Sequence, residues 1–168
     1  VLETKLNNFI VFGDRLVFDG LIKNLGLPLT INKISEPSEA IFEENYFNLF
    51  ETSKLNYLPH YGKISKECGK ASFDAIMKSI KFAKQGKVSG IVTAPISKKA
   101  LNLARINYPG HTEILAGYSN NKTVSMMLLN KHIKTVLVTL HCSMKQALER
   151  ITIQNELDAI INADLGCK

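Results

Sequence analysis

One stretch of the sequence, residues 88–113, constrains the fold more than any other. It reads VSGIVTAPISKKALNLARINYPGHTE. The apolar, β-branched residues 88–93 predict a buried strand of a parallel sheet, which Ala94 and Pro95 end. Ser97 predicts the N-cap of a short basic helix, and the turn at 108–110 predicts the start of another. Strand, turn and helix in this order indicate an α/β sheet.

Polar side chains gather where this predicted strand ends and where the two predicted helices begin. These positions lie at one edge of the sheet, the edge at which open α/β sheets bind their ligands. The side chains are those of Lys98, Lys99, His111 and Thr112. Two ammonium groups, an imidazole and a hydroxyl suit an anionic, hydroxylated ligand.

The residues before this stretch predict a βαβ unit followed by a long helix. A strand at 9–12, a helix at Arg15–Leu25 between Asp14 and Gly26, and a strand at 28–34 predict a pair of parallel strands. Residues 35–59 follow neither the helical nor the strand period, and we expect a mixed loop and strand segment there. Capped by Ser65, the helix predicted at 66–85 covers the sheet, with its lysines on a solvated face.

The last third of the chain predicts a hairpin and two helices. Residues 123–129 and 133–140 are strong strand patterns, and the short polar link between them suits an antiparallel hairpin. The sheet is therefore expected to be mixed, though mostly parallel. Ser143 predicts a helix that runs to Arg150, and Thr152 predicts another that runs to 163. Four apolar residues of the last helix are expected to face inward: Leu157, Ile160, Ile161 and Leu165.

Length and composition indicate one globular domain. The 168 residues are enough for a single core, and 45% hydrophobic with 21% charged residues is ordinary for such a domain. No run approaches the ~20 apolar residues that span a membrane, and no signal-peptide pattern is present. Cys68, Cys142 and Cys167 lack paired spacing, so we expect reduced thiols in the cytoplasm. The net charge of +6 comes from scattered lysines without an aromatic platform, which argues against nucleic acid as a partner.

Two motifs of this sequence resemble the 4-hydroxythreonine-4-phosphate dehydrogenase family of vitamin B6 biosynthesis. They are TAPISK at 93–98 and PGHTE at 109–113. The resemblance continues through VSMMLL at 124–129 and VLVTLH at 136–141, and upstream through GKIS with the glycine at 69. It implies an α/β fold with a mostly parallel, mixed α/β/α layered sheet, similar to the isocitrate/isopropylmalate dehydrogenase-like fold.

The resemblance also implies that the chain is a fragment. Residue 1 is not a methionine, and the family has a first strand before this point and a comparable length of chain after Lys168. We therefore expect residues 1–168 to be a single partial α/β domain, about half of the family's length. Since the other half is absent, we expect no NAD-dependent turnover from these residues alone.

Four site residues follow from the resemblance. It implies that His111 and Thr112 bind a phosphorylated hydroxy-amino-acid substrate and that Lys98 pairs with its phosphate or carboxylate. It implies that His141 is one of three histidines that hold a divalent cation (zinc, magnesium or cobalt) across a homodimer interface. The residues alone leave other roles open: a helix cap for Thr112, an exposed helix-start lysine for Lys98, and a strand-end histidine bonded to backbone for His141. His60 is expected to be a surface loop residue and Cys142 a small buried one.

The reaction that the resemblance implies is an NAD- or NADP-dependent, metal-assisted oxidation of 4-phosphohydroxy-L-threonine. Decarboxylation then gives 3-amino-2-oxopropyl phosphate for pyridoxal phosphate synthesis, with the metal as Lewis acid. Related family members act on other phosphorylated hydroxy acids. The alternative of another class is a non-catalytic truncated remnant, or a domain that binds a phosphorylated ligand without turnover.

Overall fold

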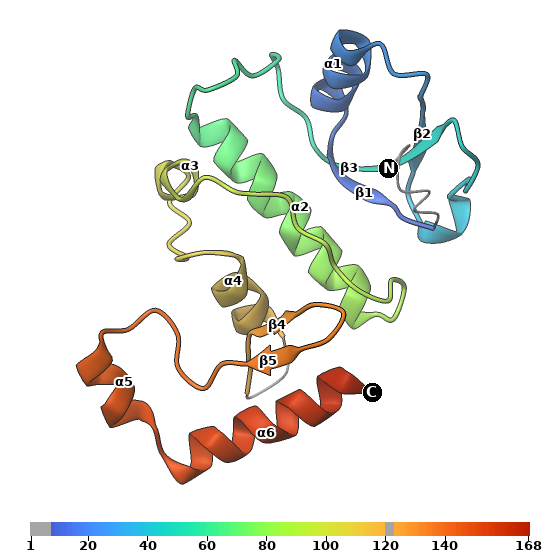
Figure 1. The fold of residues 1–168 in the computed structure, drawn as a ribbon. Coiled ribbons are helices and arrows are strands. Elements are labelled where there is room, and N and C mark those ends of the chain that lie inside the picture. Colours follow the sequence, from blue (N-terminus) through green and yellow to red (C-terminus); the bar gives the residue numbers. More distant parts are fainter. Residues whose placement is uncertain (1–7, 120–122) are drawn as a thin grey trace. The chain divides into compact units, whose positions relative to one another are not determined.

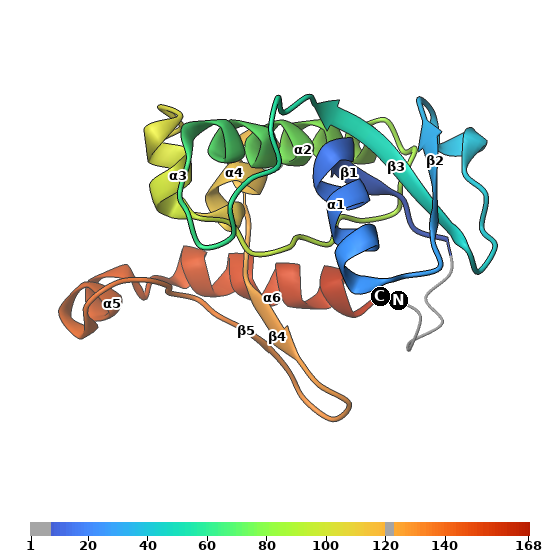
Figure 2. The same cartoon turned by 90° about the horizontal axis from the view of Figure 1, so that it is seen from above.

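The computed structural model of this protein describes residues 8–119 and 123–168. These residues form two compact units, Val1–Ser119 and Asn120–Lys168, and Figures 1 and 2 show the elements of each unit from two sides. Helices and a parallel sheet build the first unit, which agrees with the predicted α/β class. None of the described helices combines the length and the apolar character needed to cross a membrane.

The sheet of the first unit has three parallel strands in the order β1-β3-β2. They are β1 (Val11–Asp14), β2 (Thr30–Ile34) and β3 (Tyr46–Ser53). The predicted βαβ unit forms, with β1 and β2 parallel in one sheet, but the predicted pairing of these two strands is wrong because β3 lies between them. The central strand β3 comes from the segment that follows neither sequence period. A short 3-10 turn, η1 (Pro37–Glu39), precedes it.

Asp14 joins the carboxyl ends of two strands to the helix α1 (Arg15–Leu25). Its carboxylate is buried and accepts three hydrogen bonds, from Leu16 N at 3.0 Å, Ser53 Oγ at 2.9 Å and Leu55 N at 2.8 Å. The first is the predicted N-cap, and the other two tie β1 to the end of β3. The predicted end of the helix is also confirmed, since Gly26 has the left-handed φ of 59° that closes an α-helix.

The long helix α2 (Lys66–Lys84) covers the sheet, as predicted (Figure 1). Ser65 Oγ accepts the amide of Cys68 at 3.1 Å, which confirms the N-cap. Phe82 of α2 is buried against the rings of Phe12 and Phe50, at centroid distances of 5.6 and 5.1 Å. The contact follows from β3, whose Phe50 the sequence did not place in the sheet.

The lysines of α2 lie mostly on a solvated face, as predicted, since Lys70, Lys81 and Lys84 are exposed and Lys78 is half-buried. Lys70 pairs with Asp74, and Lys78 Nζ lies 4.6 Å from the ring centroid of Phe50. Lys84 Nζ donates to the carbonyl of Tyr118 at 3.1 Å. Long lysine side chains cover apolar surface with their methylenes while the ammonium finds an acceptor or a ring.

The strand predicted at 88–93 does not form. Val92 is fully exposed, with a relative accessibility of 101%, while Ile91 and Ile96 pack against the core. A strand needs a neighbour for its backbone hydrogen bonds, and none of the described strands pairs with these residues. The β-branched composition favours an extended backbone here, but composition alone supplies no partner.

We expect the backbone amides of residues 89–94 to exchange with deuterium nearly as fast as those of an unfolded peptide. The physical reason is that an unpaired, exposed amide has no protecting hydrogen bond. Amides of α2 from Ile76 to Ile80 are the internal reference, since they lie in a helix over the core. Exchange resolved by mass spectrometry checks this, and protection of residues 89–94 equal to that of α2 would contradict it.

The second unit contains the predicted hairpin. Strands β4 (Met127–Leu129) and β5 (Lys134–Val136) are antiparallel, and Asn130 Oδ1 accepts the amides of His132 and Ile133 at 2.8 Å in the turn. The strands are shorter than predicted, and among the described residues they form a sheet of their own instead of extending the parallel one. The sequence Ser-Asn-Asn at 119–121 predicts a turn, and part of it lies outside the described residues.

Both predicted helices of this unit form, but the prediction that four apolar residues of the second helix face inward is wrong. They are α5 (Met144–Arg150), with a capping box between Ser143 and Gln146, and α6 (Ile153–Cys167), capped by Thr152. The small hairpin offers too little apolar surface to cover α6, which buries only Ala159. The four residues predicted to face inward are therefore 47–66% exposed: Leu157, Ile160, Ile161 and Leu165.

Candidate functional site

Three predicted site residues of the first unit stand at the starts of two helices. Lys98 is the first residue of α3 (Lys98–Leu103), and His111 and Thr112 are the first two of α4 (His111–Tyr118). Ser97 caps α3, since its Oγ accepts the amide of Ala100 at 3.3 Å, as predicted. Lys98 is exposed and forms no ion pair with the rest of the described chain, whereas His111 and Thr112 are half-buried.

Both helices are anchored to α2 through one core. Leu101 of α3 and Ile114 of α4 are fully buried and pack with Ile76 and Ile80 of α2. At Gly69 the approach is closest, because a Cβ built there would lie 2.1 Å from the carbonyl oxygen of Ala100. Only a glycine allows α2 and α3 to cross at this distance. The shared core thus fixes the starts of α3 and α4 against the same helix.

The imidazole of His111 has an unusual environment. Its Nε2 atom is buried and has no hydrogen-bond partner in the described part of the chain. An unpaired buried polar atom costs about 1–3 kcal/mol, so such atoms are rare and call for an explanation. A ligand that hydrogen-bonds to Nε2 would supply the missing partner. The sequence carries no signal for this atom beyond the PGHTE motif.

The first turn of α4 adds to this environment. Gly110 is the N-cap residue and offers no side-chain bond to the helix, so the alternative that Thr112 caps α4 is wrong. Backbone N–H groups at an uncapped helix start, together with the helix dipole, favour an anion or an oxygen acceptor. The φ of Gly110 is 178°, an extended value that any residue adopts. The glycine is therefore not required for its backbone conformation.

His141, the predicted metal ligand, belongs to the second unit. It follows the hairpin, its side chain is exposed, and its φ of 50° lies in the left-handed region. Histidine occupies that region more often than most residues, and such conformations gather at functional sites. The described residues contain no group of three or more metal-ligating side chains. Next to it, Cys142 is half-buried rather than buried, and His60 of the first unit is exposed in a loop, as predicted.

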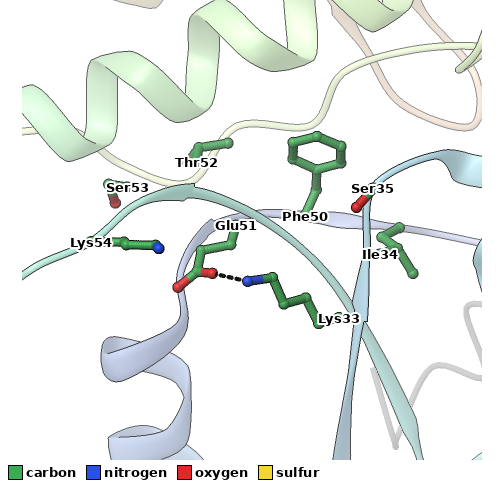
Figure 3. A pocket seen from close by; sticks show the side chains of 8 residues that line it. All are labelled: Lys33, Ile34, Ser35, Phe50, Glu51, Thr52, Ser53 and Lys54. Carbon is green, nitrogen blue, oxygen red and sulfur yellow. Dashed lines mark hydrogen bonds and ion pairs between the residues drawn. The ribbon is translucent and has the colours of Figure 1, made fainter.

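A pocket of about 420 Å³ lies at the carboxyl ends of β2 and β3 (Figure 3). Ligands of parallel sheets commonly bind at this edge. However, Lys33 and Glu51 in its lining form an ion pair with each other, with Nζ 2.5 Å from Oε2, and the hydroxyl of Ser53 donates to Asp14. Its polar side chains are thus largely paired with one another, and none of the predicted site residues lines it.

Comparison with known proteins supports the family resemblance that the two sequence motifs indicate. The family model described as pyridoxal phosphate biosynthetic protein PdxA matches residues 5–167. A 4-hydroxythreonine-4-phosphate dehydrogenase of Beijerinckia indica is 45% identical over 161 residues, which cover 96% of this chain and 48% of the relative. A protein of Fusobacterium nucleatum named as a candidate D-threonate 4-phosphate dehydrogenase is 33% identical, over 92% of this chain and 47% of its own length.

Solved structures support the same family assignment. A protein of Salmonella typhimurium named as a candidate 4-hydroxythreonine-4-phosphate dehydrogenase superposes with a TM-score of 0.88 at 27% identity, over 98% of this chain and 52% of that one. The chain therefore spans about half the length of the relatives it matches. Its α/β fold is the isocitrate/isopropylmalate dehydrogenase-like fold of these dehydrogenases. The match over residues 5–167 and the shared fold confirm the resemblance of the two motifs: the chain belongs to the pyridoxal phosphate biosynthetic protein PdxA family.

Proposed function

We propose that this chain forms the substrate-binding half of an NAD- or NADP-dependent dehydrogenase that acts on 4-phosphohydroxy-L-threonine. The observation that carries the proposal is the buried, unpartnered Nε2 of His111 at the uncapped start of α4. The name of the Beijerinckia indica relative supports the substrate. Oxidation of the C3 hydroxyl followed by loss of carbon dioxide would give 3-amino-2-oxopropyl phosphate for pyridoxal phosphate synthesis.

Each predicted residue of the first unit has a role that its chemistry supports. His111 Nε2 and the Thr112 hydroxyl hydrogen-bond to the polar groups of the substrate, and the first turn of α4 favours its negative charge. Lys98 has an exposed ammonium group with no carboxylate partner in the described chain, so it is available to a phosphate or carboxylate as a point charge. These residues bind and orient the substrate.

His141 is proposed to supply one ligand of a divalent cation. An exposed imidazole on a left-handed backbone position fits this role, and zinc, magnesium and cobalt are the candidate ions. When bound, such an ion polarises the substrate hydroxyl. One histidine is not a metal site, so the proposal includes further histidines from outside this chain and a homodimer that shares the site. The reduced thiols keep the cytoplasm as the proposed compartment.

Two alternatives have specific support. The Fusobacterium nucleatum relative is named for D-threonate 4-phosphate, which lacks the amino group of 4-phosphohydroxy-L-threonine, so a phosphorylated hydroxy acid is a second candidate substrate. The chain's half length relative to its relatives supports binding without turnover by these residues alone. Measurable NAD-dependent turnover by the isolated chain would exclude that second alternative.

Replacing His111 by alanine is expected to weaken binding of 4-phosphohydroxy-L-threonine to the chain by about ten- to a hundredfold. This range corresponds to about 1.4–2.8 kcal/mol, which lies within the cost of leaving a buried hydrogen-bonding group unpaired. Isothermal titration calorimetry measures it, with D-threonate 4-phosphate as the second ligand. The matched control is His132→Ala, which removes an exposed imidazole from the hairpin turn and should leave binding unchanged. Equal affinity of His111→Ala and the parent chain, or no heat from a folded parent chain, would sink the proposal.

A further inference from the structure

Three aromatic rings of the first unit contact one another where α4, the helix that carries His111, packs against α2. We call Phe73, Tyr108 and Tyr118 the aromatic clamp. The centroid of Phe73 lies 6.3 Å from that of Tyr108 and 6.4 Å from that of Tyr118, and the two tyrosine rings are 6.1 Å apart. Ring pairs at these separations attract one another beyond their burial alone. The clamp is therefore a closed set of three contacts.

The clamp holds both ends of α4. Tyr108 stands three residues before His111, in the turn that leads into the helix, and Tyr118 is its last residue. Phe73 belongs to α2, and all three rings pack against the core cluster that contains Ile114. An eight-residue helix fixed at both ends to a long helix cannot rotate or slide without breaking ring contacts.

Polar bonds reinforce the ring contacts. Hydrogen bonding with Tyr118 raises the pKa of Tyr108 above its ordinary value, which agrees with the close contact of the two rings. The carbonyl of Tyr118 accepts a hydrogen bond from Lys84 of α2 at 3.1 Å. The end of α4 is thus held on α2 by the Tyr118 ring, which contacts Phe73, and by the Tyr118 carbonyl, which accepts from Lys84.

We propose that the aromatic clamp positions the imidazole of His111 for its ligand. Since Nε2 has no hydrogen-bond partner in the described chain, packing of the helix has to set where that atom lies. The clamp residues are positioning residues, which act through the place of α4. This inference rests on the proposed function, because it concerns the same ligand site.

The test is Tyr118→Leu, which removes the ring and with it two of the three ring contacts. The expected result is a loss of about five- to tenfold in affinity for 4-phosphohydroxy-L-threonine, the scale of one or two aromatic pairs, with a shifted imidazole signal of His111 in the NMR spectrum of the free chain. Tyr108→Leu removes the ring of the turn residue and is expected to act alike. Tyr61→Leu makes the same chemical change at an exposed loop residue and should alter neither measurement.

The two readouts separate this inference from the proposed function. Unchanged His111 signals in both Tyr118→Leu and Tyr108→Leu would overturn the clamp, whatever the ligand does. If His111→Ala keeps full affinity, the proposed function fails, whereas a shifted His111 signal in the tyrosine variants would still support positioning. Thermal unfolding of each variant identifies a chain that has lost its fold, and Phe73→Leu then tests the clamp from α2.

Discussion

Replacing Gly69 by alanine is expected to lower the free energy of unfolding of this chain by about 3 kcal/mol, at the upper end of the cost of overpacking. The added methyl would lie 2.1 Å from the carbonyl oxygen of Ala100, far inside van der Waals contact. Because the atom it meets is backbone, no side-chain rotation relieves the clash, and α3 has to move away from α2. Urea denaturation followed by circular dichroism measures the change.

A second glycine in a helix provides the matched control. A Cβ on Gly117 of α4 would lie 3.6 Å from the ring of Tyr108, an ordinary contact. Gly117→Ala is therefore expected to stabilise the chain by roughly 0.5–1 kcal/mol through helix propensity alone. If Gly69→Ala were as stable as the parent chain, the close crossing of α2 and α3 would be wrong. Lys98 stands two residues before Ala100, so Gly69→Ala should also weaken ligand binding.

Asp14→Ala is expected to destabilise the chain by about 3–4 kcal/mol. The change removes the N-cap of α1, typically worth about 1 kcal/mol, and leaves the half-buried donors of Ser53 and Leu55 without an acceptor, at about 1–1.5 kcal/mol each, the low end of the range for an unmade bond. The three bonds to this carboxylate are 2.8–3.0 Å long, so all of them contribute. The same denaturation experiment measures the loss.

Asp19→Ala is the control for Asp14. Asp19 lies on the same helix in an exposed pair with Arg15, with about half of each side chain accessible. Exposed pairs of this kind contribute about 0–1 kcal/mol, so this variant should unfold close to the parent chain. A similar loss of stability in both variants would show that the hydrogen bonds of the buried Asp14 contribute no more to stability than the exposed ion pair of Asp19. A difference of 2 kcal/mol or more, on the scale of the lost donors, would support the network.

Helix starts could be predicted from the sequence because the information is local. Ser65, Ser97 and Ser143 each accept a backbone amide three residues ahead, so the cap and its helix lie within one turn. Strands were less predictable. β3 contains the buried Asn48, whose side chain bonds to Asn32 and Ile41, and these partners are invisible to a search for apolar alternation.

The candidate site also has features that the sequence predicts and features that only the structure shows. The positions of Lys98, His111 and Thr112 at helix starts follow from turns and caps that the sequence shows directly. The buried Nε2, the crossing at Gly69 and the left-handed φ of His141 arise from tertiary packing. The PGHTE motif identified His111 and Thr112, but it could not show that Nε2 of His111 lacks a hydrogen-bond partner in the described chain.

The exposed segment before α3 affects the apparent Kd of any ligand that Lys98 binds. No backbone hydrogen bond joins residues 89–95 to the rest of the described chain, so the segment is held by side chains such as Ile91, which packs against the core. A segment held so lightly samples several conformations, and the apparent Kd rises in inverse proportion to the fraction that can bind. A polypeptide that paired with this backbone would therefore tighten the ligand, and the ligand would tighten that polypeptide by the same factor.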